Sequence, residues 1–273
     1  MGLMQGKRGL IMGVANDHSI AWGIATALHA AGAELAFTYQ GEAFGKRVAP
    51  LAAKIGAAHV LPCDVTDDAS VDKVFATLGE AWGALDFVVH AIAYSDKEEL
   101  KGRYLDTSRA NFARTLMISC YSFTAIAKAA RPLMRNGGAL LTLSYLGAER
   151  VTPNYNVMGV AKAALEASVR YLAADLGPES IRVNAISAGP MRTLAGSAIA
   201  DARFVYGWSR DHAPMRRAVA LEEVGGSGLY LLSELSGGVT GEVLYVDCGF
   251  NLVGIPHPHS MTAGEIDKAR QNG

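Results

Sequence analysis

Short, largely apolar runs alternate with longer segments of helical period along most of the chain. The runs are bounded by glycine, proline or polar residues, and they do not alternate strictly between apolar and polar positions. This pattern is typical of strands buried on both faces of a parallel sheet. The runs expected to form strands are 9–13, 34–39, 58–61 with Cys63 following, 86–91, 139–143, 181–187 and 243–246.

Between these runs, apolar residues recur at the spacing of a helix face. Asp17 or Ser19 is expected to cap the first helix, and Gly32 to stop it. The regular alternation predicts an α/β fold, a single doubly wound, Rossmann-type parallel sheet of about seven strands with helices on both faces. The expected helices are 19–31, 43–54, 67–82, 108–130, a long helix that starts near Tyr155, and 221–232.

The chain contains no linker-like composition and no internal repeat, so residues 1–255 are expected to form one dinucleotide-binding and catalytic domain. The segment 191–217 has no clear period and lies between a strand and a helix. Long irregular segments in such folds are often lids over a substrate, and we expect a substrate lid here. Residues 256–273 form a polar tail that contains His257 and His259. Two histidines without a third ligand do not predict a metal site.

Composition narrows the class of protein. Hydrophobic residues make up 50% of the 273 residues, charged residues 19%, and the net charge is −1. This balance indicates a large core and gives no basic surface for nucleic acid or membrane. No stretch is long enough to span a membrane. The three cysteines are widely spaced in apolar surroundings, as expected of reduced thiols in a cytoplasmic protein.

Tyr155 and Lys162 are the first candidates for chemistry. They are seven residues apart, about two helical turns, so their side chains share one face. An ammonium beside a phenol favours the phenolate, which predicts a lowered tyrosine pKa and proton transfer near neutral pH. Tyr145 lies at the end of the preceding strand, where it could fold back over the same site. Taken alone, the pair is better explained as a helix-start tyrosine and a solvated surface lysine, and only the rest of the chain changes that balance.

The residues that follow each strand indicate a dinucleotide site. Ligands of open α/β sheets bind at the carboxyl ends of the strands, near the switch in strand order. Gly13 after the first strand and Ser19 at the next helix start suit a pyrophosphate, although the turn is not a GxGxxG motif. Gln40 ends the second strand with no cation before Lys46, which favours NADH over NADPH. Asp64 follows the third strand and could accept a hydrogen bond from the adenine amine.

Five motifs carry a resemblance that covers essentially residues 5–255. They are GVANDHSIAWGIA (13–25), CDVT (63–66), HAIAYSDKEELKGRY (90–104), SYLGAERVTPNYNVMGVAKAALE (144–166) and AGPMRTLA (188–195). The chain resembles the short-chain dehydrogenase/reductase superfamily, and within it the NADH-dependent enoyl-acyl-carrier-protein reductases of bacterial fatty-acid synthesis. Ordinary members of the superfamily place tyrosine and lysine four residues apart. Here the spacing is seven, and Gly159 stands where their lysine would be.

The resemblance implies a role for each matching residue. Tyr145 and Tyr155 match the two active-site tyrosines, Lys162 the lysine on the nicotinamide ribose, and Ser95 a position beside the substrate. Ala93 and Met191 depart from the glycine and isoleucine of many relatives, but both remain apolar. The positions that match NADH contacts are Gly13, Ser19, Ile20, Gln40, Asp64, Val65, Ile92, Lys162, Met191, Arg192, Thr193, Leu194 and Ala195.

The implied reaction is hydride transfer from NADH to the β-carbon of a trans-2-enoyl thioester carried by acyl-carrier protein. Tyr155 would stabilise the enolate oxygen that forms. The resemblance also implies a homotetramer, with Asn111 and Arg114 of the long helix packing between subunits. Two other interpretations remain open, a ketoacyl or other carbonyl reductase of the same superfamily, with Thr142 and Ser144 near its usual serine, and a non-catalytic dinucleotide-binding regulator.

Overall fold

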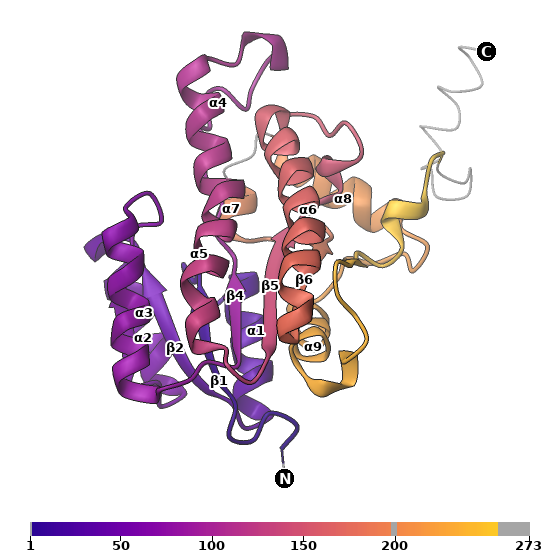
Figure 1. The fold of residues 1–273 in the computed structure, drawn as a ribbon. Helices are drawn as coiled ribbons and strands as arrows, with labels where there is room; N and C mark the ends of the chain where they lie inside the picture. Colours follow the sequence, from indigo (N-terminus) through magenta and orange to yellow (C-terminus); the bar gives the residue numbers. More distant parts are fainter. Residues whose placement is uncertain (1, 198–200, 256–273) are drawn as a thin grey trace, which may run out of the picture.

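Seven parallel strands form one sheet in the computed structural model, which describes residues 2–197 and 201–255. The strand order is β3-β2-β1-β4-β5-β6-β7, which is the doubly wound arrangement expected from the sequence (Figure 1). The strands are β1 (Arg8–Met12), β2 (Glu34–Tyr39), β3 (His59–Pro62), β4 (Phe87–His90), β5 (Gly138–Ser144), β6 (Ile181–Ala188) and β7 (Val243–Val246).

Helices cover both faces of this sheet. One apolar core lies between the sheet and helices α3, α5 and α6, and the other between the sheet and helices α1, α2 and α9. The α-helices are α1 (Ile20–Ala30), α2 (Gly41–Lys54), α3 (Asp68–Trp82), α4 (Arg109–Leu116), α5 (Ser122–Ala130), α6 (Asn156–Leu176), α7 (Leu194–Ser197), α8 (Ala202–His212) and α9 (Leu221–Leu232). Short 3-10 turns occupy Tyr104–Asp106, Arg131–Leu133, Leu146–Ala148, Gly177–Glu179, Glu234–Ser236 and Phe250–Leu252.

Strand order reverses between β1 and β4. The chain moves outward from β1 to β2 and β3, then returns to place β4 on the other side of β1. The two loops that leave β1 and β4 therefore diverge to opposite faces, and a crevice opens between them at the carboxyl ends. Gly13, directly after β1, has φ +95°, and a Cβ there would lie 2.0 Å from the carbonyl oxygen of Ala91. Only glycine permits this close approach of the two strand ends.

Two sequence expectations about elements were wrong. Residues 108–130 form α4 and α5 joined by a π-turn (Met117–Tyr121), instead of one regular helix. Segment 191–217, expected to be irregular, contains α7 and the eleven-residue α8. α8 is amphipathic, so its sequence contains a helical signal that the expectation overlooked. The tail 256–273, with His257 and His259, lies outside the described residues.

Candidate active site

A cavity of about 1170 Å³ opens at the carboxyl ends of the strands, beside the switch between β1 and β4. It is large enough for a dinucleotide with space left for a second ligand. The loops after β1, β2, β3, β4, β5 and β6 all contribute to its wall. The sequence-predicted site residues that line it are Gly13, Ile20, Gln40, Val65, Ile92, Ser95, Tyr145, Tyr155, Lys162, Met191, Thr193 and Leu194.

The Ser19 side chain fixes the shape of the turn after β1 by hydrogen bonding to its backbone. Its hydroxyl oxygen accepts hydrogen bonds from the backbone N–H groups of Ala15 and Asn16, both at 3.0 Å. Ser19 stands at the N-cap position of α1 but makes no side-chain cap hydrogen bond, so the expected cap does not form. Ser19 is buried and does not line the cavity, whereas its neighbour Ile20 does. Its structural part is to hold the shape of the turn after β1.

Gln40 and Asp64 meet at the ends of β2 and β3. The Gln40 amide donates to the Asp64 carboxylate at 3.0 Å, so its carbonyl oxygen remains available to the cavity. The Thr66 backbone N–H and hydroxyl also donate to Asp64, and these bonds hold the pKa of its carboxyl below the ordinary value. Asp64 is therefore a carboxylate at neutral pH, and it lies just behind the cavity wall that Gln40 and Val65 form.

Tyr155 enters the cavity from the N-cap position of α6. The residues on either side of it, Asn154 and Asn156, have φ values of +58° and +38°. Asparagine tolerates this left-handed region better than most residues, and the unusual backbone aims the ring inward. The Asn156 amide is fixed by donating to the Leu100 carbonyl at 3.1 Å. Tyr145 packs edge-on against Tyr155, with ring centroids 4.9 Å apart.

Gly159 explains how the tyrosines come so close to the end of β5. A Cβ at this position would lie 2.7 Å from the Gly147 carbonyl oxygen, inside any real contact distance. The first turns of α6 can therefore approach the loop after β5 only because Gly159 has no side chain. The residue that stands in place of an ordinary superfamily lysine thus has a packing role of its own.

Lys162 lines the same cavity as Tyr155, and both residues are 6% exposed. The Lys162 ammonium donates to the Leu143 carbonyl oxygen at 2.7 Å, at the end of β5. Burial lowers the lysine pKa from 10.5 to about 8. The ammonium therefore faces the cavity in a poorly solvated place, where its charge acts strongly on a ligand.

The predicted lowering of the Tyr155 pKa was wrong. Burial, together with the neighbouring Tyr145 and Glu166, raises the pKa of Tyr155 well above its ordinary value. Burial also raises the pKa of Tyr145 to about 12, although a hydrogen bond with Thr152 opposes the shift. Desolvation dominates because burial makes the charged phenolate costly. Both tyrosines are neutral phenols at neutral pH, and a neutral phenol can donate a hydrogen bond.

Ser95 lies at the cavity wall, in the loop after β4. Its hydroxyl is held by Asn111 and Thr115 of α4. Asn111 is only 4% exposed within the single chain, and Arg114 lines the cavity. The expectation that these two residues pack between subunits is therefore wrong for Asn111, whose side chain is buried and hydrogen-bonded within the single chain. Arg114 faces the cavity.

The segment after β6 forms the remaining wall. The Arg192 guanidinium lies 4.7 Å from the centroid of the Tyr206 ring and does not line the cavity. Ala195 is in α7. The sequence analysis gave no site role to several lining residues that come from elements far apart in the chain. They are Phe44, Leu100, Arg114, Ile118, Met158 and Tyr206.

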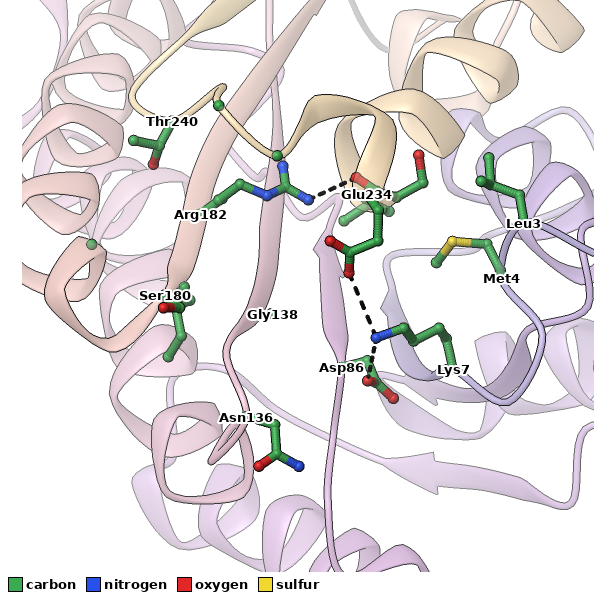
Figure 2. Close-up of a pocket in the computed structure, with 16 residues that line it drawn as sticks. Leu3, Met4, Lys7, Asp86, Asn136, Gly138, Ser180, Arg182, Glu234 and Thr240 are labelled. Atoms are coloured by element: carbon green, nitrogen blue, oxygen red, sulfur yellow. Dashed lines mark hydrogen bonds and ion pairs between the residues drawn. The ribbon is translucent and has the colours of Figure 1, made fainter.

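A second cavity, of about 430 Å³, lies at the opposite end of the sheet, where the strands begin (Figure 2). Its charged side chains are already paired. The Lys7 ammonium lies 3.2 Å from Asp86 and 3.7 Å from Glu234. The Arg182 guanidinium donates to the carbonyls of Leu231 and Ser233 at the end of α9. These pairs join β6, α9 and the amino-terminal segment, so we assign this cavity a structural role.

None of the helices in residues 2–197 and 201–255 is long and apolar enough to cross a membrane. Within the same ranges, no three histidine, cysteine or acidic side chains gather as metal ligands would.

A doubly wound sheet, a glycine turn after β1 and a tyrosine–lysine pair at the strand ends define a dinucleotide-dependent oxidoreductase of the short-chain type. A family model described as enoyl-(acyl carrier protein) reductase matches residues 13–251. The chain belongs to this family. It is 65% identical over 266 residues to the NADH-dependent enoyl-[acyl-carrier-protein] reductase 2 of Rhizobium meliloti, covering 97% of this chain and 99% of that protein.

Solved structures agree with this assignment. The enoyl-acyl-carrier-protein reductase of Anaplasma phagocytophilum in complex with NAD is 61% identical, with a TM-score of 0.91, and covers 94% of this chain and 98% of that one. The Bacillus cereus enoyl-acyl-carrier-protein reductase, solved with NADP+ and indole naphthyridinone, is 50% identical with a TM-score of 0.92 and covers 93% and 100%. The predicted family and fold are confirmed.

Proposed function

We propose that this protein reduces the carbon–carbon double bond of trans-2-enoyl thioesters carried by acyl-carrier protein, with NADH as the hydride donor, in fatty-acid elongation. The observation that carries the proposal is the buried Tyr155–Lys162 pair at the strand ends of a chain that belongs to the enoyl reductase family. The pair has the seven-residue spacing of that family, and Gly159 excludes the four-residue spacing of ordinary carbonyl reductases.

The cavity wall fits a dinucleotide along its length. Gln40, Val65 and Ile92 stand at the adenosine end, and the turn of Gly13 and Ile20 faces the pyrophosphate. At the nicotinamide end we place Lys162, which would bind the ribose hydroxyls, together with Met191, Thr193 and Leu194. Asp64 supports this set by holding Gln40, and Ser19 supports it by holding the turn. Arg192 and Ala195 belong to the same stretch, although the Arg192 guanidinium lies against the Tyr206 ring.

NADH, when bound, would supply the hydride for the β-carbon of the enoyl group, and the proton for the α-carbon would come from solvent water. The thioester oxygen gains negative charge as the reaction proceeds, and the Tyr155 phenol is suited to donate a hydrogen bond to it. A donor with a raised pKa keeps its proton, so it stabilises the enolate without itself ionising. Lys162 adds positive potential at the same end of the cavity, and Tyr145 packs the Tyr155 ring into place.

Residues 1–255 would form the single catalytic domain, with 191–217 as the substrate lid. Leu194, Val205 and Tyr206 of the lid line the cavity, as side chains that contact an acyl chain would. We also propose a cytoplasmic homotetramer. Large apolar side chains are exposed along the π-turn and α6, among them Met117, Tyr121 and Tyr171, at 46%, 53% and 77%. An apolar helical surface of this kind suits contact with a second copy.

The test of this function follows nicotinamide absorbance with purified protein. NADH and NADPH are each combined with a trans-2-enoyl thioester and with a 3-ketoacyl thioester of equal chain length. Oxidation of NADH with the enoyl substrate alone is the expected result. Activity only on the ketoacyl thioester would make the protein a carbonyl reductase, and NADH binding without turnover of either substrate would make it a dinucleotide-binding regulator.

A further inference from the structure

Three buried polar side chains form a stripe along α4 and the π-turn that follows it. They are Asn111, Thr115 and Ser119, with exposures of 4%, 0% and 0%. We call them the polar stripe. Buried polar groups require hydrogen-bond partners, and a helix interior usually avoids them. All three find partners in one short segment of the loop after β4, Tyr94–Asp96, which lines the active-site cavity.

Each member of the polar stripe bonds a different part of this segment. The Ser119 hydroxyl accepts from the Tyr94 backbone N–H at 2.9 Å and donates to the Tyr94 carbonyl at 3.0 Å. The Thr115 hydroxyl donates to the Ser95 hydroxyl at 2.9 Å. The Asn111 amide donates to the same hydroxyl at 3.2 Å and accepts from the Asp96 backbone N–H at 3.0 Å.

The π-turn brings Ser119 into line with the other two. In an α-helix each fourth residue moves on by about 40° round the axis, so a stripe of this spacing drifts away from a straight loop. A π-turn has more residues per turn and reduces that drift. The turn is anchored where it ends, because the Ser122 hydroxyl lies 2.8 Å from Nε2 of the buried His90 at the end of β4. Such turns are often found at functional sites.

We infer that the polar stripe is a positioning device for the substrate wall, and that it helps to set which acyl chains the enzyme accepts. The inference rests on the proposed function. The stripe fixes both backbone polar groups of Tyr94 and the Ser95 hydroxyl, while Ile118 of the π-turn lines the cavity beside them. None of the three residues contacts Gln40, Gly13 or Lys162 through a hydrogen bond in the described structure, so NADH has no direct dependence on them.

The test compares Ser119→Ala with a matched control, Ser236→Ala. Both serines are fully buried and bond a backbone carbonyl, but Ser236 lies just after α9, away from the cavity. For Ser119→Ala we expect the KM for the enoyl thioester to rise about tenfold, since one lost hydrogen bond is typically worth that factor. The Kd for NADH should stay within about twofold of wild type. The ratio of kcat/KM between a four-carbon and a twelve-carbon substrate should change, and it should not change in Ser236→Ala.

A second pair guards against a variant that simply folds poorly. Thr115→Val removes the hydroxyl at nearly constant volume, whereas Thr115→Ser keeps the hydroxyl and removes only the methyl group. Thr115→Val should show the same change in KM and in chain-length ratio as Ser119→Ala. Thr115→Ser should stay close to wild type in both quantities. An unchanged chain-length ratio in both Ser119→Ala and Thr115→Val overturns the inference, as does a parallel loss of NADH affinity. If wild type itself does not turn over enoyl thioesters, the proposed function has failed instead.

Discussion

The surroundings of Tyr155 keep its phenol protonated. Its ring is buried between Tyr145 and the start of α6, and burial makes ionisation of the phenol costly. A neutral phenol at this place donates a hydrogen bond that is strongest when the thioester oxygen has become negative. This difference between ground state and transition state is what accelerates a reaction.

Tyr155→Phe should therefore lower kcat by about 10²–10³, the usual cost of one lost donor to an oxyanion. The Kd for NADH, followed by nucleotide fluorescence, should hardly change. Tyr145→Phe is the matched control, since it removes a phenol hydroxyl from the partner ring and should cost far less. A Tyr155→Phe enzyme with full turnover would remove the residue from the mechanism.

The charge of Lys162 predicts how NADH binding depends on pH. Burial lowers its pKa to about 8, so the folded protein holds an ammonium below that pH and a neutral amine above it. The Kd for NADH should rise as the pH passes from 7 to 9, because the ribose loses its cationic partner. Titration of the Kd across that range is the measurement.

Lys162→Met supplies the control for this pH dependence. The variant should bind NADH weakly at every pH and show no inflection near 8. The contribution of Lys162 to folding stability depends on pH in the opposite direction to its contribution to NADH binding. The unfolded lysine, with a pKa near 10.5, binds its proton more tightly than the folded one, so this residue favours folding more as pH rises between about 8 and 10.5. An NADH affinity independent of pH in wild type would contradict the role given to Lys162.

At the scale of elements, Arg182 of β6 fastens the end of α9. Its guanidinium donates to the carbonyls of Leu231 and Ser233 and to the hydroxyl of Ser236, at 2.7 to 3.0 Å. These acceptors stand where a helix ends and its last carbonyls lack intrahelical partners. Figure 2 shows the guanidinium lying against this helix end. The contact links the sheet directly to the helix that covers it.

Arg182→Met should lower the free energy of unfolding by about 3 kcal/mol, since it leaves partly buried carbonyls without a charged donor. Denaturant titration measures the change. Arg131→Met is the control, because the Arg131–Glu179 pair is largely exposed and solvent screens it, so its loss should change the free energy of unfolding far less. Equal losses in the two variants would show that the α9 contact is no stronger than a surface ion pair.

Hydrophobic periodicity in the sequence is enough to locate most of the elements. The bounds of β2 (Glu34–Tyr39) and α9 (Leu221–Leu232) agree at both ends with the predicted runs. The π-turn could not be found this way, because one widened turn changes the pattern of a long helix too little. The sign of the Tyr155 pKa shift was also beyond reach, since spacing shows that a cation is near but not how far water is excluded.

The residues of the candidate site could likewise be predicted only in part from the sequence. The residues directly after strands, such as Gly13 and Gln40, follow from the rule for parallel sheets, and the family resemblance added Ser95 and the stretch after β6. Lining residues such as Phe44 and Ile118 were missed because they come from helical segments that only the packed fold brings to the cavity. Their side chains have no pattern that distinguishes a cavity wall from a core.

At the scale of the whole molecule, the cavity should couple cofactor binding to stability. A ligand that binds only the folded state at a hundred times its Kd stabilises it by about 2.7 kcal/mol. NADH should therefore raise the melting temperature measured by thermal unfolding. NADPH at the same concentration should raise it less, because the Asp64 carboxylate behind Gln40 repels a 2′-phosphate.

Asp64→Asn tests the cause of that difference, since it removes the charge and keeps the size. The gap between the NADH and NADPH shifts should narrow in this variant. Arg47, which lies across the Phe44 ring at 5.8 Å, is the cation that could still favour a 2′-phosphate. Equal shifts for the two nucleotides in wild type would show that Arg47 outweighs Asp64.

The candidate site and the amino-terminal segment lie at opposite ends of the sheet, and this arrangement suits immobilisation of the protein. Side chains for chemistry gather where the strands finish, whereas Leu3 and Met4 lie beside the paired charges where the strands begin (Figure 2). A bead or sensor surface coupled near the amino-terminal residues meets the molecule at the end away from the cofactor cleft. Protein immobilised in that orientation keeps its opening toward solution, which suits a flow assay in which nucleotide and thioester are exchanged over the same molecules.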